Sequence, residues 1–168
     1  MPTLTQVKTA TRVRTKVALA FAAGVVLAAA AVYGTSALAQ RAAREQAAFL
    51  QFAKGKIFLQ VESRGEAFYV YPDDKKRYYL GRPADAFAVM RQLGLGVRHD
   101  FMLQSTVFPT HVVGKILIDV DDRGKAYYIS PSDRQAYYLG RPADAFRVMR
   151  SQGLGITNGA LARITLAE

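Results

Sequence analysis

The chain has 168 residues with no cysteine, no tryptophan and only two histidines, His99 and His111. The lack of cysteine excludes disulfides, thiolate catalysis, cysteine-based zinc sites and lipid attachment through a cysteine. The folded part must therefore be held together by its hydrophobic core. No HExxH motif, phosphate-binding loop or catalytic-triad spacing occurs. We therefore expect a protein that is not an enzyme and that uses no cofactor.

Acidic residues are absent before Glu45. Residues 1–16 carry four basic side chains, residues 17–32 form an alanine-rich apolar run, and residues 35–39 end in an A-x-A pattern. This order is typical of a secretory signal peptide, here cleaved after Ala39. An uncleaved membrane anchor is the alternative, because the apolar run approaches the length of a spanning helix. Either reading predicts an extracytoplasmic protein, secreted or anchored at the cell envelope.

Much of the positive charge lies in this first segment. The chain has 23 basic and 13 acidic side chains, and four of the basic ones precede residue 40. Residues 40–168 therefore carry 19 basic and 13 acidic side chains, a net charge of +6. A positive surface suits adhesion to anionic polymers or lipid headgroups. Nucleic acid is disfavoured as a partner because an exported protein meets little of it.

The most informative feature is an internal repeat. The ten residues YYLGRPADAF occur at 78–87 and again at 137–146. The same register, 59 residues apart, extends over 55–103 and 114–162, with 26 of 49 positions identical. The chain therefore contains one small module twice. A module of this size is marginal alone, so we expect the two copies to support each other.

The segments around the repeats complete the predicted organisation. Residues 40–54 are rich in alanine and other good helix formers, which predicts a helical spacer. Residues 104–113 contain Pro109 and no periodicity, which predicts a linker between the modules. Residues 163–168 form a short C-terminal tail. The order is thus signal or anchor (1–39), spacer, module 1 (55–103), linker, module 2 (114–162) and tail.

Each module is predicted to fold as β-β-β-α, which makes the protein α+β. Apolar side chains occupy every second position at Ile57, Leu59 and Val61, as in a half-buried strand. A second strand follows a glycine turn, and a third covers Arg77–Leu80. A helix begins at Pro83, where a missing N–H costs nothing. We expect it to end at a left-handed glycine, Gly94, and to cover one face of a three-stranded antiparallel sheet.

The hairpin register decides which side chains share that face. A two-residue turn at Arg64-Gly65 pairs Val61 with Phe68 and Leu59 with Val70. All four side chains then lie under the helix. Tyr78 and Leu80 of the third strand join them. The opposite face of each sheet is then left with tyrosines.

The run GKIFLQVESRGEAFYVYPDDKKRYYLGRPADAFAVMRQLGLG, and its second copy, resemble a repeat of exported proteins from small-genome, mostly uncultured bacteria. That repeat often carries tryptophan where this chain has Phe68 and Tyr127. It has no established activity. The resemblance therefore implies an extracytoplasmic, modular protein and supplies no catalytic residue.

Tyrosines on the outer face are the first candidate site. Tyr69 and Tyr79 in module 1, and Tyr128 and Tyr138 in module 2, are expected to be cross-strand neighbours there. A flat surface of tyrosines stacks well on sugar rings, because each ring is apolar at one end and polar at the other. The alternatives are that such pairs only stabilise the sheet, or that the faces are buried against each other or against the spacer helix.

Two arginines form the second candidate site. Arg82 and Arg141 precede the helix prolines, where a cation opposes the helix dipole. With the free N–H groups of the helix start, they would bind a phosphate or carboxylate. The alternative is that each arginine pairs with an acid of the first turn, Asp85 or Asp144, or lies over a tyrosine ring.

The sequence gives little support for a metal site or a catalytic site. Residues 119–124 resemble a calcium loop only superficially, because Arg123 and Ser130 occupy positions that require oxygen ligands and a glutamate. Neither histidine recurs in the other copy. We therefore predict no metal site. A small hydrolase would have to use the recurring acids Asp74/Asp133 and Asp85/Asp144.

The sequence thus favours an exported, non-catalytic binding module at the cell envelope. Its expected ligand is a cell-wall glycan, an anionic surface polymer or a partner protein, held by the four tyrosines and two arginines. If the N-terminal segment is not cleaved, it also contacts the membrane. The main alternative is a structural spacer or assembly repeat, and a small hydrolase ranks third.

Overall fold

The computed structural model describes residues 37–104 and 106–167. A helix covers residues 37–53, where the sequence predicts a spacer helix. The chain divides into two compact units, and the second, Ala48–Glu168, holds both repeats. The predicted signal peptide or anchor lies outside the described residues, apart from its last three positions. Within the described part, no helix is both long enough and apolar enough to cross a membrane.

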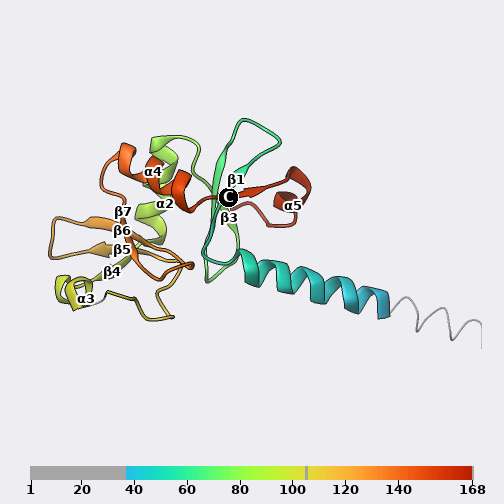
Figure 1. Cartoon of the computed structure of the whole chain (residues 1–168), viewed down its shortest axis with the longest axis horizontal. Coiled ribbons are helices and arrows are strands. Elements are labelled where there is room, and N and C mark those ends of the chain that lie inside the picture. The colour runs from blue at the N-terminus through green and yellow to red at the C-terminus, as the bar shows by residue number, and fades with distance from the viewer. Residues whose placement is uncertain (1–36, 105, 168) are drawn as a thin grey trace, which may run out of the picture. The chain divides into compact units, whose positions relative to one another are not determined.

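The two copies contain the same elements in the same order (Figure 1). The first copy has β1 (Ile57–Gln60), β2 (Ala67–Val70), β3 (Arg77–Tyr79), α2 (Pro83–Leu93), β4 (Leu95–Val97) and α3 (His99–Gln104). The second has β5 (Ile116–Asp119), β6 (Lys125–Ile129), β7 (Ala136–Tyr138), α4 (Pro142–Gln152), β8 (Leu154–Ile156) and α5 (Asn158–Ala162).

The copies exchange their fourth strands. Among the described residues, one sheet has the order β3-β2-β1-β8 and the other β4-β5-β6-β7. The exchanged strands, β8 and β4, pair in parallel with β1 and β5, whereas the other pairs are antiparallel. The α+β class is therefore confirmed. The prediction of two self-contained, three-stranded modules is wrong, because each sheet is completed by the other copy.

Glycines make this exchange possible. Gly94 ends α2 with φ −66° and ψ 128°, so it is extended and leads directly into β4. The predicted left-handed cap is therefore wrong. A Cβ atom on Gly94 would lie 2.5 Å from the Met90 carbonyl oxygen, and one on Gly153 would lie 2.3 Å from the Met149 carbonyl oxygen. Glycine suits these positions because the last turn of each helix leaves no room for a side chain where the chain turns into the exchanged strand.

The first hairpin has a longer loop than predicted. Residues 61–66 separate β1 from β2, and the amide of Gln60 donates a hydrogen bond of 2.9 Å to the carbonyl of Glu66 across the loop. In the second copy the loop covers residues 120–124, and Arg123 and Gly124 both have positive φ. A two-residue turn is therefore not formed in either copy.

The longer loop shifts the register by an odd number of residues. Ile57 pairs with Tyr69 and Leu59 pairs with Ala67. An odd shift turns every side chain of a strand to the opposite face. Tyr69 consequently lies on the face covered by the helices, and Phe68 and Val70 lie on the outer face. The predicted face of β2 is therefore wrong.

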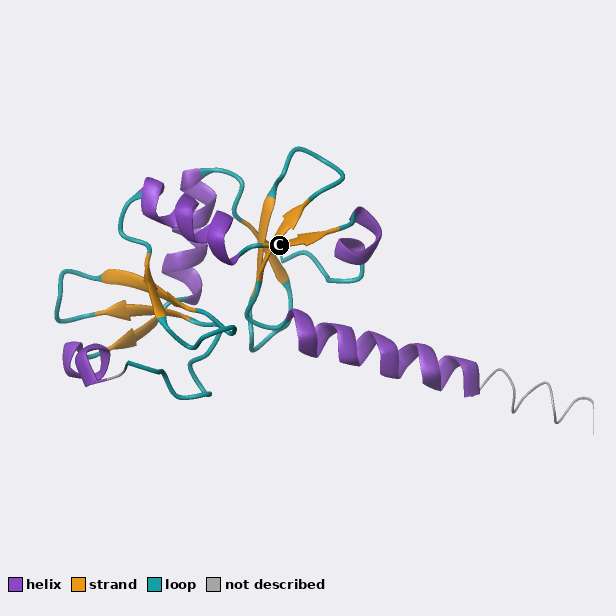
Figure 2. Ribbon diagram, viewed as in Figure 1, coloured by secondary structure: helices purple, strands orange, loops and turns teal. Residues whose placement is uncertain are grey.

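Figure 2 shows how the helices and strands are arranged. Three hydrophobic clusters follow from this arrangement. The central cluster lies between the two sheets and contains the buried faces of α2 and α4; its buried members are Ile57, Tyr69, Val89, Met90, Ile116, Tyr128, Leu139, Ala145 and Val148. The outer face of the first sheet is covered by the end of the 37–53 helix and by α5. The outer face of the second sheet is covered by α3 and by Phe108 and Val112 of the linker.

The segment predicted as a C-terminal tail is part of this packing. Ile164 is fully buried in the outer cluster of the first sheet. Leu166 forms a parallel bridge with Arg77 at the edge of β3. The unit therefore uses residues on both sides of the repeats to close its sheets.

The copies touch most closely at two glycines. Gly55 and Gly114 have φ of +74° and +78°, and a Cβ atom on Gly55 would lie 2.6 Å from Gly114 Cα. The Tyr69 hydroxyl donates a hydrogen bond of 2.6 Å to the Gly114 carbonyl, and Tyr128 donates one of 2.7 Å to the Gly55 carbonyl. The two bonds are equivalent, so the copies hold each other reciprocally.

Candidate functional site

Two of the four predicted stacking residues are inaccessible. Tyr69 and Tyr128 are only 1% and 2% exposed, and their rings meet edge to face with centroids 6.3 Å apart. Burial raises the pKa of both phenols. Their role in the structure is to join the copies, and a ligand cannot stack on them. The predicted outer tyrosine surface is therefore not formed.

Tyr79 and Tyr138 remain partly exposed. Each ring packs against the aromatic residue opposite it on the neighbouring strand, with centroids 5.5 Å from Phe68 and 5.4 Å from Tyr127. Tyr79 also lies over Gly81, where a Cβ atom would be 2.0 Å from the phenol. The cross-strand neighbour of Tyr79 is thus Phe68, whereas the sequence predicted Tyr69.

The two candidate arginines pair locally. Arg82 Nε and Nη2 donate hydrogen bonds of 2.8 and 3.0 Å to the Asp85 carboxylate, and Arg141 binds Asp144 in the same way. The two hydrogen bonds raise the pKa of Arg82 and lower that of Asp85. The structure thus shows the alternative in which each arginine pairs with its own first-turn acid, although the Arg82 side chain is still 76% exposed.

The other recurring acids also have local partners. Asp74 accepts hydrogen bonds from the Lys76 amide and the Tyr78 hydroxyl, and Asp133 accepts the equivalent bonds in the second copy. Burial, together with the bond to Asp74, raises the pKa of Tyr78 to about 12. These carboxylates stabilise turns, and they do not converge with Asp85 or Asp144 on a shared cavity.

A groove of about 720 Å³ lies beside α2 and α4. Its floor is the seam between α2 and α4, which contribute equivalent prolines, alanines, phenylalanines and methionines. One wall comes from the first copy alone, from the hairpin loop and the end of β3. The floor residues are Pro83, Ala86, Phe87, Met90, Pro142, Ala145, Phe146 and Met149, and the wall includes Leu59, Ala67, Tyr79 and Leu80.

The rim of the groove is positively charged. Arg64, Arg82 and Arg150 line it, and Glu66 is the one acidic side chain among its lining residues. Arg150 lies over the Phe146 ring, 5.7 Å from its centroid. Ligand pockets typically have volumes of about 300–1,000 Å³, an apolar lining and a few polar groups that fix orientation. This groove fits an anionic ligand that has an apolar part.

The sequence predicted two residues of the groove, Tyr79 and Arg82, as site residues, but it did not predict most of the others. Phe87 and Phe146 are 55% and 56% exposed, whereas the helical spacing of Ala86, Phe87, Met90 and Leu93 predicts that all four share the buried face of that helix. A signal was available, because Ala86, Val89 and Met90 already form a buried stripe and leave Phe87 beside it. The pairing of α2 with α4 depends on the strand exchange, so the sequence alone did not show it.

Comparison with protein-family models, curated proteins and solved structures gives no match for this chain. The function must therefore be argued from the chemistry of the groove and of the residues around it.

Proposed function

We propose that the chain is an exported, non-catalytic binding module of the cell envelope, and that its groove holds an anionic ligand with an apolar part. The groove between α2 and α4 is the observation that carries this proposal. Export is proposed from the basic and apolar pattern of residues 1–39. The ligand class is narrower than the sequence indicated, because the apolar floor and the arginines favour an anionic polymer over a neutral glycan.

The apolar floor and the arginines act on different parts of such a ligand. The exposed Phe87 and Phe146 side chains gain free energy when a ligand covers them, at roughly 25 cal/mol per Å². Arginine side chains present planar arrays of donors that suit carboxylate, sulfate and phosphate groups. Because the rim is solvent-exposed, its contribution should weaken as the salt concentration rises.

Charge reversal at the rim provides the test. Arg64 and Arg150 line the groove. The residues at the equivalent positions of the repeat, Arg123 and Arg91, do not line it. We expect R64E/R150E to weaken binding of the anionic arene probe 8-anilinonaphthalene-1-sulfonate by about tenfold or more, since one tenfold step is about 1.4 kcal/mol. R91E/R123E makes the same change in net charge and should leave affinity within about twofold.

Fluorescence titration of the purified full chain measures both affinities, and thermal melting checks that each variant is folded. A panel of purified anionic envelope polymers is then tested for competition with the probe. If both double variants lose the same amount of probe affinity, binding depends only on the net charge of the chain and not on the groove. Absence of saturable probe binding to the wild-type chain would remove the groove as a ligand site.

A structural or assembly role is the second candidate. The observation that favours it is the pair of exposed rings, Phe87 and Phe146, that lie in the same groove. If the groove is an assembly surface, sedimentation velocity should show concentration-dependent oligomers, and F87E/F146E should abolish them. A chain that remains monomeric at all concentrations, with the probe bound, would leave only the ligand-binding role.

A further inference from the structure

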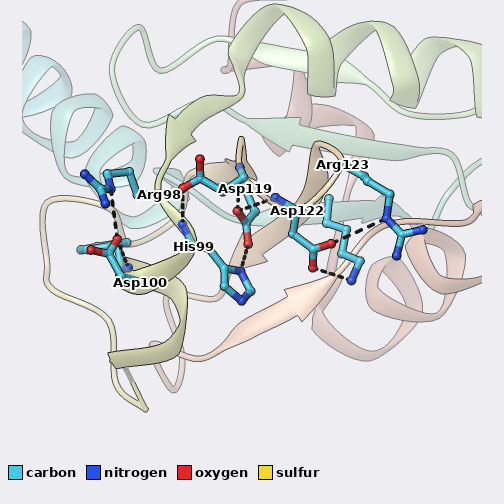
Figure 3. Close-up of polar contacts among 9 residues, drawn as sticks. Arg98, His99, Asp100, Asp119, Asp122 and Arg123 are labelled. Atoms are coloured by element: carbon cyan, nitrogen blue, oxygen red, sulfur yellow. Dashed lines mark hydrogen bonds and ion pairs between the residues drawn. The ribbon is translucent and has the colours of Figure 1, made fainter.

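A cluster of His99, Asp119 and Asp122 lies away from the groove, at the start of α3 and the end of β5 (Figure 3). The potential ligand atoms of these three side chains all lie within 4.8 Å of one another. His99 Nδ1 is 2.6 Å from Asp119 Oδ2. The Asp119 side chain is 1% exposed, Asp122 is 24% exposed and His99 is 44% exposed, so the cluster is anchored in the interior and open on one side.

The strand exchange brings this cluster together. His99 belongs to the first copy and follows β4, whereas both aspartates belong to the second copy. Because β4 pairs with β5, His99 reaches the loop that follows Asp119. The backbone amide of His99 also donates a hydrogen bond of 3.1 Å to Asp121 Oδ2, which fixes the start of α3 against that loop.

The other copy has the same arrangement without charges at these positions. Its equivalents are Asn158, Gln60 and Ser63, and Gln60 Nε2 donates a hydrogen bond of 2.6 Å to Asn158 Oδ1. The Asn158 amide donates to Glu62, as the His99 amide does to Asp121. In this copy, the side-chain amides of Gln60 and Asn158 therefore form the contact without any charged group. A buried carboxylate is costly unless it is paired or coordinates a metal, and in this structure Asp119 is paired with His99, so the second copy has an ion pair where the first has two amides.

We propose that His99, Asp119 and Asp122 form a binding site for a divalent transition-metal ion, for which Zn²⁺ is the first probe. Imidazole and carboxylate ligands suit zinc, which takes nitrogen and oxygen ligands at about 2.0–2.2 Å. Three donors on such an ion are mutually about 3.3 Å apart. The ligand atoms lie within 4.8 Å of one another, so the half-buried His99 and Asp122 side chains would have to move closer by up to about 1.5 Å when the ion binds. This proposal is independent of the groove and of its ligand.

The surroundings orient the ligands for a metal. Asp119 Oδ1 accepts hydrogen bonds of 3.2 Å from the amides of Asp121 and Asp122, which leaves Oδ2 directed at His99. Such outer partners typically fix ligating carboxylates. Lys125 currently donates a hydrogen bond to Asp122 Oδ2, and its side chain is 34% exposed. A divalent ion would replace that ammonium group, and Lys125 would turn into solvent.

Isothermal titration of the full chain with zinc chloride tests the proposal. We expect one saturable site in the wild-type chain. H99N introduces the residue that the other copy tolerates at this position, so it should fold and lose affinity by about 100-fold or more, since altering an outer partner alone costs about 10–100-fold. H111N removes the other histidine and should leave binding unchanged.

A gain-of-site variant makes the test sharper. Q60D/S63D/N158H copies the three residues into the first sheet, where the Asn158 amide contacts Glu62 as the His99 amide contacts Asp121, and should raise the stoichiometry from one zinc ion to two. Zinc at 100 times its dissociation constant should raise the Tm of the wild-type chain by about 8 °C, because the ion links segments of both copies. H99N should show no such shift.

Visible absorption of the cobalt-substituted chain gives an independent readout, since nitrogen and oxygen ligation of Co²⁺ changes its spectrum. Absence of zinc binding by the wild-type chain overturns the proposal. So does binding that H99N leaves intact, or binding that H111N removes, because either result places the ion elsewhere.

Discussion

Replacing Gly55 or Gly114 with alanine is expected to lower the free energy of unfolding by about 3 kcal/mol. Both residues have positive φ, which costs a non-glycine residue about 1–2 kcal/mol. The new methyl group would also meet the backbone of the other glycine at 2.6 or 2.5 Å. Overpacking of this kind typically costs about 1–3 kcal/mol. Urea denaturation of each single variant measures the loss.

Two other glycines provide matched controls. Gly65 has φ +75° but open space around its Cβ position, so G65A should show the backbone strain alone, about 1 kcal/mol. Gly159 lies in α5 with no positive φ and no neighbour within 4 Å, so G159A should be neutral or slightly stabilising. If G55A is no more harmful than G65A, the copies do not meet at these glycines.

Replacing Tyr69 and Tyr128 together with phenylalanine is expected to destabilise the protein by about 2–3 kcal/mol at neutral pH, because two buried hydroxyl–carbonyl hydrogen bonds are lost. The variant should also change the response to alkali. Burial raises the pKa of both tyrosines in the folded state, whereas in the unfolded chain they ionise near pH 10, the ordinary value of about 10.

The sign of the pH effect follows from this difference. Below about pH 10 both tyrosines are protonated in both states, and their contribution to stability is fully present. As the pH rises above about 10, the unfolded chain releases protons first, so that contribution is lost as the pH approaches the folded pKa values. Urea titrations from about pH 7 to about pH 11 should therefore show a shallower decline in Y69F/Y128F than in the wild-type chain.

Y138F is the control for this experiment, because Tyr138 is 40% exposed and does not join the copies. It should leave the free energy of unfolding at neutral pH nearly unchanged. A decline of equal slope in Y69F/Y128F and the wild-type chain would contradict the buried position of the two phenols.

Local chemistry explains which elements the sequence predicted well. The helix start at Pro83 is confirmed because proline favours the first turn, and Asp85 occupies that turn as expected. The alternation at β1 correctly placed Ile57 towards the helices. Tyr78 and Leu80 are likewise packed against the central cluster. These features depend on short-range preferences that each residue carries with it.

Loop geometry and long-range pairing explain the errors. The Arg64-Gly65 turn signal is real, since Gly65 has positive φ, but the loop is longer, and its extra residues reverse the face of β2. Strand β4 has three residues and contains Gly96, so it has no periodicity to detect. Its stability comes from the partner strand, and nothing within ten residues of it in the sequence indicates that partner.

The residues of the candidate sites also fall into two groups, those that local preferences predict and those that only long-range packing brings together. Tyr79 and Arg82 were found because they stand beside a turn and a helix start, where local rules apply. Phe146 and Arg150 of α4 reach the same groove only because α2 and α4 pack together, and Arg64 reaches it from the loop between β1 and β2. His99 and Asp119 are 20 residues apart and come from different copies. Sequence spacing cannot predict this contact, because the strand exchange is what places the imidazole beside the carboxylate.

By itself, the amino-acid order determined the duplication, the α+β composition and the start of each long helix, because these depend on identity between copies and on nearest-neighbour preferences. Only the tertiary structure decided that the copies interlock, that Tyr69 and Tyr128 are buried and that His99 meets Asp119. The physical reason is that a three-residue strand has no stability of its own. It forms where a neighbouring strand supplies hydrogen bonds and glycines allow close approach, and that partner lies in the other copy.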